Sequence, residues 1–188
     1  MNIEIRALAP EGLNDFLGFF EGEAFADNPK WASCFCQFLY VDHRVVHWPG
    51  RSHDENRAAA CERIACGRMQ GWLAFDEGRP VAWCSAAPRR LMAAFDDAPD
   101  PEAGHIGQIG CFVVAKSHRR SGIATRLLNA ACEAFRAQGL RIAEATPLSG
   151  AGTDAQQHYG PLAMFLAAGF VPLREEDGKT IVRRSLLD

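Results

Sequence analysis

The sequence predicts an α/β fold, a mixed β-sheet flanked by helices, built as one domain over residues 1–188. An apolar, β-branched run at 109–115 leads into an amphipathic pattern at 121–138, as expected for a buried strand followed by a helix. Two pairs of short apolar runs, at 72–86 and 171–185, each enclose a glycine-containing turn. Such pairs favour hairpins, so several neighbouring strands should be antiparallel.

The first two elements follow from different periodicities. Ile3 and Ile5 alternate with charged residues, which predicts a half-buried strand near the N-terminus. Leu13, Phe16 and Phe20 then recur at helical spacing, so a first helix should run to about residue 21.

Residues 27–70 form an aromatic region that we expect to be largely helical. A helix should begin near Pro29, with Asp27 or Asn28 as its cap. The stretch 31–48 then gathers aromatic side chains among cysteines and histidines. It is either an aromatic helix seated on the core or the wall of a ligand pocket, because such pockets are rich in aromatic side chains. Another helix should open at Ser52 and run to about residue 69.

Residues 88–104 are predicted to form a loop with one short helix near 90–95. The loop carries four acidic residues, which are Asp96, Asp97, Asp100 and Glu102. They form either a solvated surface or a patch whose charge attracts a cationic ligand.

The junction between the central strand and its helix has the features of a phosphate site. The start of a helix leaves backbone N–H groups without intrahelical partners and carries partial positive charge. Phosphate binds there when the chain can approach closely. Gly122 and Ala124 keep the approach open, and Arg119 and Arg120 add positive charge. We therefore expect this junction to hold a pyrophosphate.

The C-terminal third continues the alternation of helices and strands. Gly139 should end the amphipathic helix as a C-cap, and a strand should follow at 141–146. The polar segment 147–158 predicts a loop, and 159–170 a short helix that ends at Gly169.

Two motifs resemble those of the GNAT superfamily of N-acetyltransferases. Arg119-x-x-Gly122-x-Ala124, after an apolar strand, matches the family pattern Arg/Gln-x-x-Gly-x-Gly/Ala, which binds the pyrophosphate of acetyl-CoA. The run from Met164 to Phe170 is similar to the family's Leu-Tyr-x-x-x-Gly-Phe. The resemblance is close over residues 109–174, and the N-terminal third matches in element order alone.

The resemblance implies a three-layer fold with a mostly antiparallel sheet of six or seven strands. Residues 105–174 would form the cofactor core, and 27–70 an elaboration on the acceptor side. Acetyl-CoA would be the cosubstrate, held by the backbone of the central strand and by the loop and helix start after it. The residues implied are Phe112, Val113, Val114, Arg119, Arg120, Ser121, Gly122, Ile123, Ala124 and Thr125.

The catalytic groups depart from the family pattern, because the usual tyrosine, a general acid for the leaving thiolate, falls at Phe165. Phenylalanine has no proton to donate. Tyr159 is the candidate acid instead, and Glu144 the candidate base acting through water. The alternatives are a solvent-facing tyrosine and a salt-bridged glutamate. A thiol nucleophile at Cys84 or Cys111 is a further alternative, although neither has an obvious partner base.

The expected reaction is direct transfer of an acetyl group from acetyl-CoA to a primary amine in a ternary complex. The acceptor would be a small-molecule or peptide amine, in a pocket that includes Trp31, Phe35 and His158. Two alternatives remain open: a catalytically silent acyl-CoA sensor, suggested by Phe165, and a protein-interaction module that docks through the aromatic region.

Composition indicates which partners to expect. The net charge of −3 gives no reason to expect nucleic acid. No apolar run reaches the roughly 18 residues of a membrane helix, and the N-terminus does not look like a signal peptide. We therefore expect a cytoplasmic protein whose seven cysteines are reduced, with no membrane partner. Cys34-x-Cys36 lacks further ligands at regular spacing, so no metal is expected. The resemblance makes a homodimer possible.

Overall fold

The described part of the chain contains one sheet whose seven strands are β1 (Ile3–Ala7), β2 (Gly71–Asp76), β3 (Arg79–Pro88), β4 (Ile106–Val114), β5 (Ile142–Ala145), β6 (Val171–Glu176) and β7 (Lys179–Ser185). The computed structural model describes residues 2–95, 100–150 and 158–187. The strand order is β1-β2-β3-β4-β5-β7-β6. Neighbouring strands are antiparallel except β4 and β5, which are parallel. The predicted mixed, mostly antiparallel sheet is confirmed.

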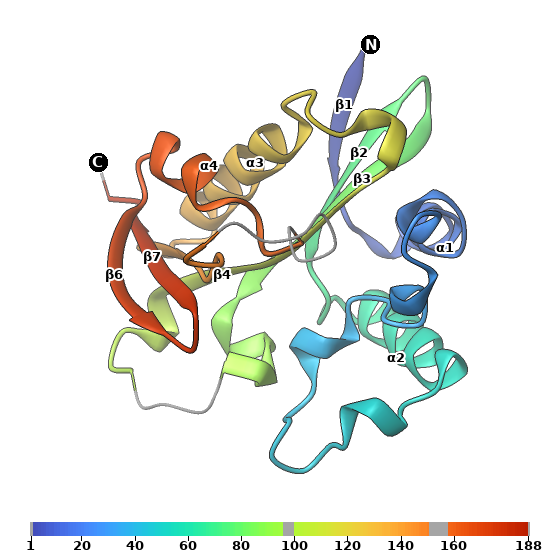
Figure 1. Cartoon of the computed structure of the whole chain (residues 1–188), viewed down its shortest axis with the longest axis horizontal. Coiled ribbons are helices and arrows are strands. Elements are labelled where there is room, and N and C mark those ends of the chain that lie inside the picture. The colour runs from blue at the N-terminus through green and yellow to red at the C-terminus, as the bar shows by residue number, and fades with distance from the viewer. Residues whose placement is uncertain (1, 96–99, 151–157, 188) are drawn as a thin grey trace.

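Helices pack on both faces of this sheet and produce three layers. They are α1 (Leu13–Glu21), α2 (His53–Ala65), α3 (Ile123–Ala137) and α4 (Leu162–Ala167). In Figure 1, α3 and α4 lie on one face of the sheet, and α1 and α2 lie on the other face. The buried side chains form two clusters accordingly, and Trp83 and Cys84, adjacent on β3, belong to different clusters. This is the alternation that a strand imposes on its side chains.

The helix boundaries agree with the sequence signals where a defined cap is present. Ser52 and Glu55 form a reciprocal capping box at the start of α2. Gly139 follows α3 with a positive φ of 78°, as a glycine C-cap requires. In the described ranges, no helix has both the length and the apolar character needed to cross a membrane.

The aromatic stretch after α1 is not the helix that its composition suggested. It forms three short 3₁₀ turns, Pro29–Trp31, Gln37–Tyr40 and Trp48–Gly50, and no side chain caps the first of them. Phe35 and Cys36 adopt left-handed backbone conformations, with φ of 43° and 57°. Two consecutive residues of this kind cannot continue a right-handed helix. The stretch therefore winds over the sheet and turns its aromatic side chains in several directions.

The two central strands part halfway along their length. β4 extends from Ile106 to Val114, but its pairing with β5 covers only residues 106–109. Gly110 is left unmatched in the ladder with β3, where Ser85 pairs with Cys111 and Ala86 pairs with Ile109. One extra residue of this kind is a β-bulge, which bends the strand and increases its twist. Beyond the bulge, the edge of β4 that faces away from β3 has no strand partner among the described residues.

The packing of β4 on α3 leaves no room for a side chain at Gly107. A Cβ atom there would lie 2.2 Å from the ring of Phe135, which is fully buried. We predict that Gly107→Ala lowers the free energy of unfolding by about 1–3 kcal/mol, because overpacking displaces the helix. Urea denaturation monitored by circular dichroism measures the change.

Gly104→Ala is the matched control, because nothing lies within 4 Å of the added Cβ. It should change the free energy of unfolding by less than about 0.5 kcal/mol. Equal effects of the two substitutions would contradict the packing described for β4 and α3.

Candidate active site

A cleft of about 640 Å³ lies where the start of α3 meets the free edge of β4. Nine of the ten residues predicted to hold acetyl-CoA line this cleft, and Ser121 is the exception. The Ser121 hydroxyl donates to the backbone carbonyl of His118, so it braces the turn instead. The loop from 119 to 122 is exposed or partly exposed, as a ligand site requires.

The start of α3 offers unpaired backbone donors to this cleft. Gly122 is the N-cap in a left-handed conformation with φ of 80°, and no side chain caps the helix. The N–H of Arg126 donates to the Gly122 carbonyl at 3.2 Å and makes the first helical hydrogen bond. The N–H groups of residues 123–125 therefore have no intrahelical acceptor. Nothing lies within 4 Å of the position that a Cβ on Gly122 would take, so an anion can approach closely.

The two arginines of the loop differ in their surroundings. Arg119 forms a two-point ion pair with Asp27, at 2.7 and 2.9 Å, and its Nε donates to the Val114 carbonyl at 3.1 Å. The hydrogen bonds from Arg119 lower the pKa of Asp27, so the pair stays charged at neutral pH. Arg119 thus ties the aromatic region to the loop, whereas Arg120 is exposed at the cleft.

The free edge of β4 presents backbone N–H groups of alternate residues. The N–H of Ala115 donates to the Val81 carbonyl at 2.9 Å, on the β3 side. Because residues alternate in an antiparallel ladder, Val113 also directs its N–H toward β3. Phe112 and Val114 then direct theirs toward the gap between β4 and β5. Of the three strand residues predicted to hold acetyl-CoA, Phe112 and Val114 therefore present their N–H groups to the gap, and Val113 does not.

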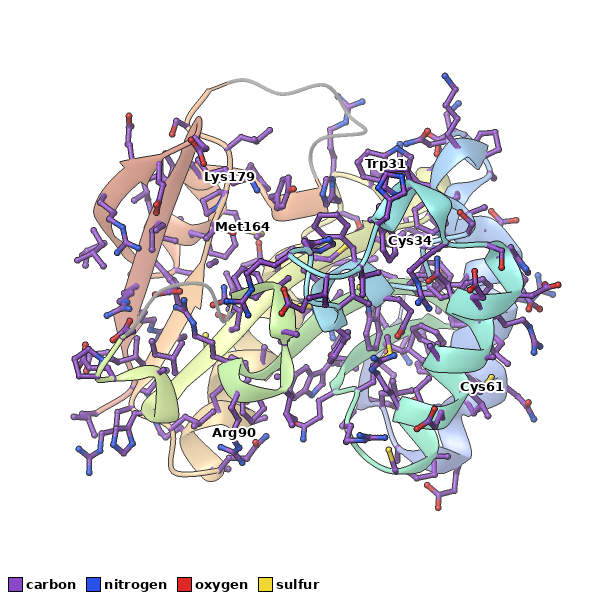
Figure 2. All side chains as sticks on the ribbon, turned by 90° about the horizontal axis from the view of Figure 1, so that it is seen from below. Trp31, Cys34, Cys61, Arg90, Met164 and Lys179 are labelled. Carbon is purple, nitrogen blue, oxygen red and sulfur yellow. The ribbon has the colours of Figure 1, made fainter. Side chains whose placement is uncertain are left out.

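A second cavity of about 390 Å³ adjoins the cleft. The cavity and the cleft share Phe25, Trp31, Val113 and His158 in their linings. The rings of Trp31 and His158 lie 4.5 Å apart, although they are distant in sequence. Figure 2 shows Trp31 close to Cys34, which also lines the second cavity.

Tyr159 reaches this cavity, but Phe35 does not. The ring of Tyr159 packs on His158 at 3.9 Å, and the Lys179 ammonium lies 4.5 Å from its centre. Phe35 is fully buried and stacks on Phe20 in the core below. The structure therefore brings together Trp31, His158 and Tyr159 from the predicted set and leaves Phe35 outside it.

Glu144 lies away from both cavities. Its side chain is 3% exposed, and its two carboxylate oxygens accept hydrogen bonds from Arg89 and Arg183, each at 2.6 Å. Arg183 also pairs with Asp100 and Glu102. Glu144 stands opposite Gln108 in the paired half of β4 and β5, before the strands part. This arrangement favours the salt-bridged glutamate over the general base.

The same ion pairs bear on the acidic loop. Asp100 and Glu102 both pair with Arg183, which also pairs with Glu144, so the charge of this part of the loop is partly compensated. Asp96 and Asp97, the other two members of the acidic patch, lie outside the described residues.

Three cysteines form part of the wall of the second cavity, a role that the sequence did not reveal. They are Cys34, Cys36 and Cys111. Burial raises the pKa of the Cys34 thiol to about 12. The hydrogen bond from Cys111 lowers the pKa of Cys36, whose sulfur also accepts from the Trp83 indole at 3.4 Å. Cys84, considered above as a nucleophile, is fully buried and lines neither cavity.

Glu144→Gln separates a structural from a catalytic role. Removing the charge takes from Arg89, whose side chain is 12% exposed, its carboxylate partner, whereas Arg183 keeps Asp100 and Glu102. We predict a loss of about 3–5 kcal/mol in the free energy of unfolding, typical of a broken buried pair. Chemical denaturation measures it, with the exposed Glu133→Gln as the control. An unchanged stability with lost turnover would restore the general base.

Comparison with known proteins supports the resemblance seen in the sequence. Residues 33–159 match the model of the acetyltransferase (GNAT) family. No curated protein matches the sequence.

Solved structures share the fold at low sequence identity. An N-acetyltransferase from Staphylococcus aureus Mu50 has a TM-score of 0.61 and 16% identity, with 100% of each chain covered. The PaiA N-acetyltransferase from Thermoplasma acidophilum, in complex with coenzyme A, has a TM-score of 0.60 and 13% identity, over 98% of this chain and 99% of that one. YncA, a putative acetyltransferase from Salmonella typhimurium with acetyl-CoA, has a TM-score of 0.58 and 13% identity, over 99% and 95%. With more than half of its length matched by the family model, the chain belongs to the GNAT family of acetyltransferases.

Proposed function

We propose that this protein transfers an acetyl group from acetyl-CoA to a primary amine by direct attack in a ternary complex. The observation that carries the proposal is that the cleft and the second cavity, which differ in their lining residues, adjoin each other at Val113. One offers the unpaired N–H groups and the positive charge of a helix start, which suit a pyrophosphate. The other is lined mainly by aromatic and apolar side chains, which suit an acceptor.

The backbone would supply most of the binding and orientation. The N–H groups at the start of α3 would hold the phosphates, and those of Phe112 and Val114 would stabilise negative charge on the carbonyl oxygen of the acyl group. Acetyl-CoA supplies an activated thioester when it is bound. Holding both substrates in one geometry can lower the barrier by as much as about 7–11 kcal/mol, and no particular side chain is needed for it.

Tyr159 is the proposed proton donor to the leaving thiolate. Its position in the second cavity, in contact with His158, places it near the junction with the cleft. The family's usual tyrosine position is Phe165, which is fully buried between Phe112 and Phe170. In this proposal the proton donor is therefore Tyr159, which precedes α4, and not a residue of α4 itself.

A silent acyl-CoA sensor is the second candidate, because Phe165 cannot donate a proton. The two candidates differ in one measurement. Release of free thiol from acetyl-CoA in the presence of amines supports the enzyme, whereas coenzyme A binding without thiol release over a broad panel of amines supports the sensor.

Thr125→Glu tests the phosphate site without harming the fold. Thr125 is exposed in the first turn of α3 and lines the cleft. A carboxylate there is favourable to the helix dipole, so the stability should not fall. It repels phosphate, and we predict that the dissociation constant of coenzyme A rises at least about tenfold by calorimetry.

Thr125→Gln has the same size without the charge, and its effect on coenzyme A binding should be much smaller. The difference between the two variants should shrink at high salt, because screening weakens charge repulsion. Equal binding by both variants would rule out a phosphate at the start of α3.

Tyr159→Phe tests the proton donor. The ring contacts with His158 and Lys179 are kept, so binding of coenzyme A should be unchanged. We predict that kcat falls by about 10²–10⁴, the usual contribution of a general acid. Stopped-flow thiol release across a range of pH measures it, and an unaltered turnover at every pH would remove Tyr159 from the mechanism.

A further inference from the structure

The cavity beside the coenzyme A cleft has the size of a small-molecule site. Its volume of about 390 Å³ falls in the range of roughly 300–1,000 Å³ that such sites occupy. Aromatic and aliphatic side chains dominate its walls, and they include Phe20, Phe25, Trp31, Phe38, Leu39 and Trp48. Most of them come from the 3₁₀ turns between α1 and α2. The unexpected winding of that segment is what builds the cavity.

The charges around this cavity are as informative as its apolar walls. Among the described residues that line it, none carries a carboxylate, and the basic ones are Lys30 and His158. An acceptor with several ammonium groups would leave some of them buried without an anionic partner, which is costly. The cavity therefore disfavours polyamines and amino sugars.

The same walls can hold an amine and make it reactive. An ammonium group is attracted to the faces of aromatic rings, and Trp31 lines both the cavity and the cleft. Once it is enclosed by apolar side chains, desolvation lowers the pKa of the amine and favours its neutral, nucleophilic form. A carboxylate base is then not required, which agrees with the position of Glu144 outside both cavities.

We propose that the acceptor is a primary amine carried on an aromatic or bulky apolar group, an inference that rests on the proposed function. The apolar group fills the cavity of 390 Å³, and the amine lies at its junction with the cleft, beside Val113 and His158.

A panel of amines tests this substrate class. Coenzyme A binding to the full chain is measured first by calorimetry, and thiol release from acetyl-CoA is then measured with 2-phenylethylamine, tryptamine, spermidine and lysine. We expect kcat/KM for the two aromatic amines to exceed that for spermidine and lysine by about 10- to 100-fold, the effect of burying one aromatic group.

The outcomes distinguish the proposed function from the proposed substrate class. No heat with coenzyme A would overturn the proposed function and this inference together. Binding of coenzyme A with a preference for spermidine or lysine would overturn the inference alone.

Two matched variants locate the effect in the cavity. Phe38 lines it and is 40% exposed, so truncation should leave the fold intact. Phe38→Ala should raise KM for 2-phenylethylamine about tenfold and leave the dissociation constant of coenzyme A unchanged. Leu173, on β6, is 51% exposed and lines neither cavity, so Leu173→Ala should change KM by less than about twofold. Equal changes in KM, with both variants folded by thermal melting, would overturn the proposal.

Discussion

The parting of β4 from β5 after residue 109 is the constraint on which the cleft and its neighbouring cavity depend. In a continuous sheet every backbone N–H of a central strand is used by the ladder. Here an extra residue at Gly110 bends β4 away, and the second half of the strand keeps donors on its outer edge. A glycine suits the bulge, since a Cβ there would lie 2.5 Å from a terminal methyl of Leu39 and would force that side chain to move. The aromatic segment thus packs directly on the point of divergence.

Carboxylate–arginine contacts occur beside both halves of the sheet, the half where β4 and β5 pair (closed) and the half where they have parted (open). In the closed half, Glu144 joins Arg89 to Arg183 below the surface, where loss of one charge is expensive. In the open half, Arg119 joins Asp27 near the surface, where an ion pair contributes roughly 0–1 kcal/mol. The Arg119–Asp27 pair joins the start of the aromatic segment to the loop that precedes α3, and both residues line the cleft.

Local signals in the sequence predicted most of the fold. The helix start at Ser52, the glycine after α3 and the hairpin turn between β2 and β3 depend on residues a few positions apart, and the structure has each of them. The prediction of a helix in the aromatic segment was wrong. Phe35 and Cys36 adopt a left-handed backbone, and neither is a residue type that favours this conformation, so no signal of it is present in the sequence. Their backbone is set by the packing of the aromatic rings, which composition alone does not reveal.

The sequence by itself determined the family and the loop that we propose to bind phosphate, because a helix start after a buried strand is a local arrangement with a local signature. Only the tertiary structure decided which side chains face the second cavity. Trp31 and Tyr159 meet there through long-range packing, whereas Phe35 turns into the core and Glu144 finds two arginines on other elements. Contacts between residues far apart in the chain form only when the helices pack on the sheet, and the spacing of residues in the sequence does not predict them.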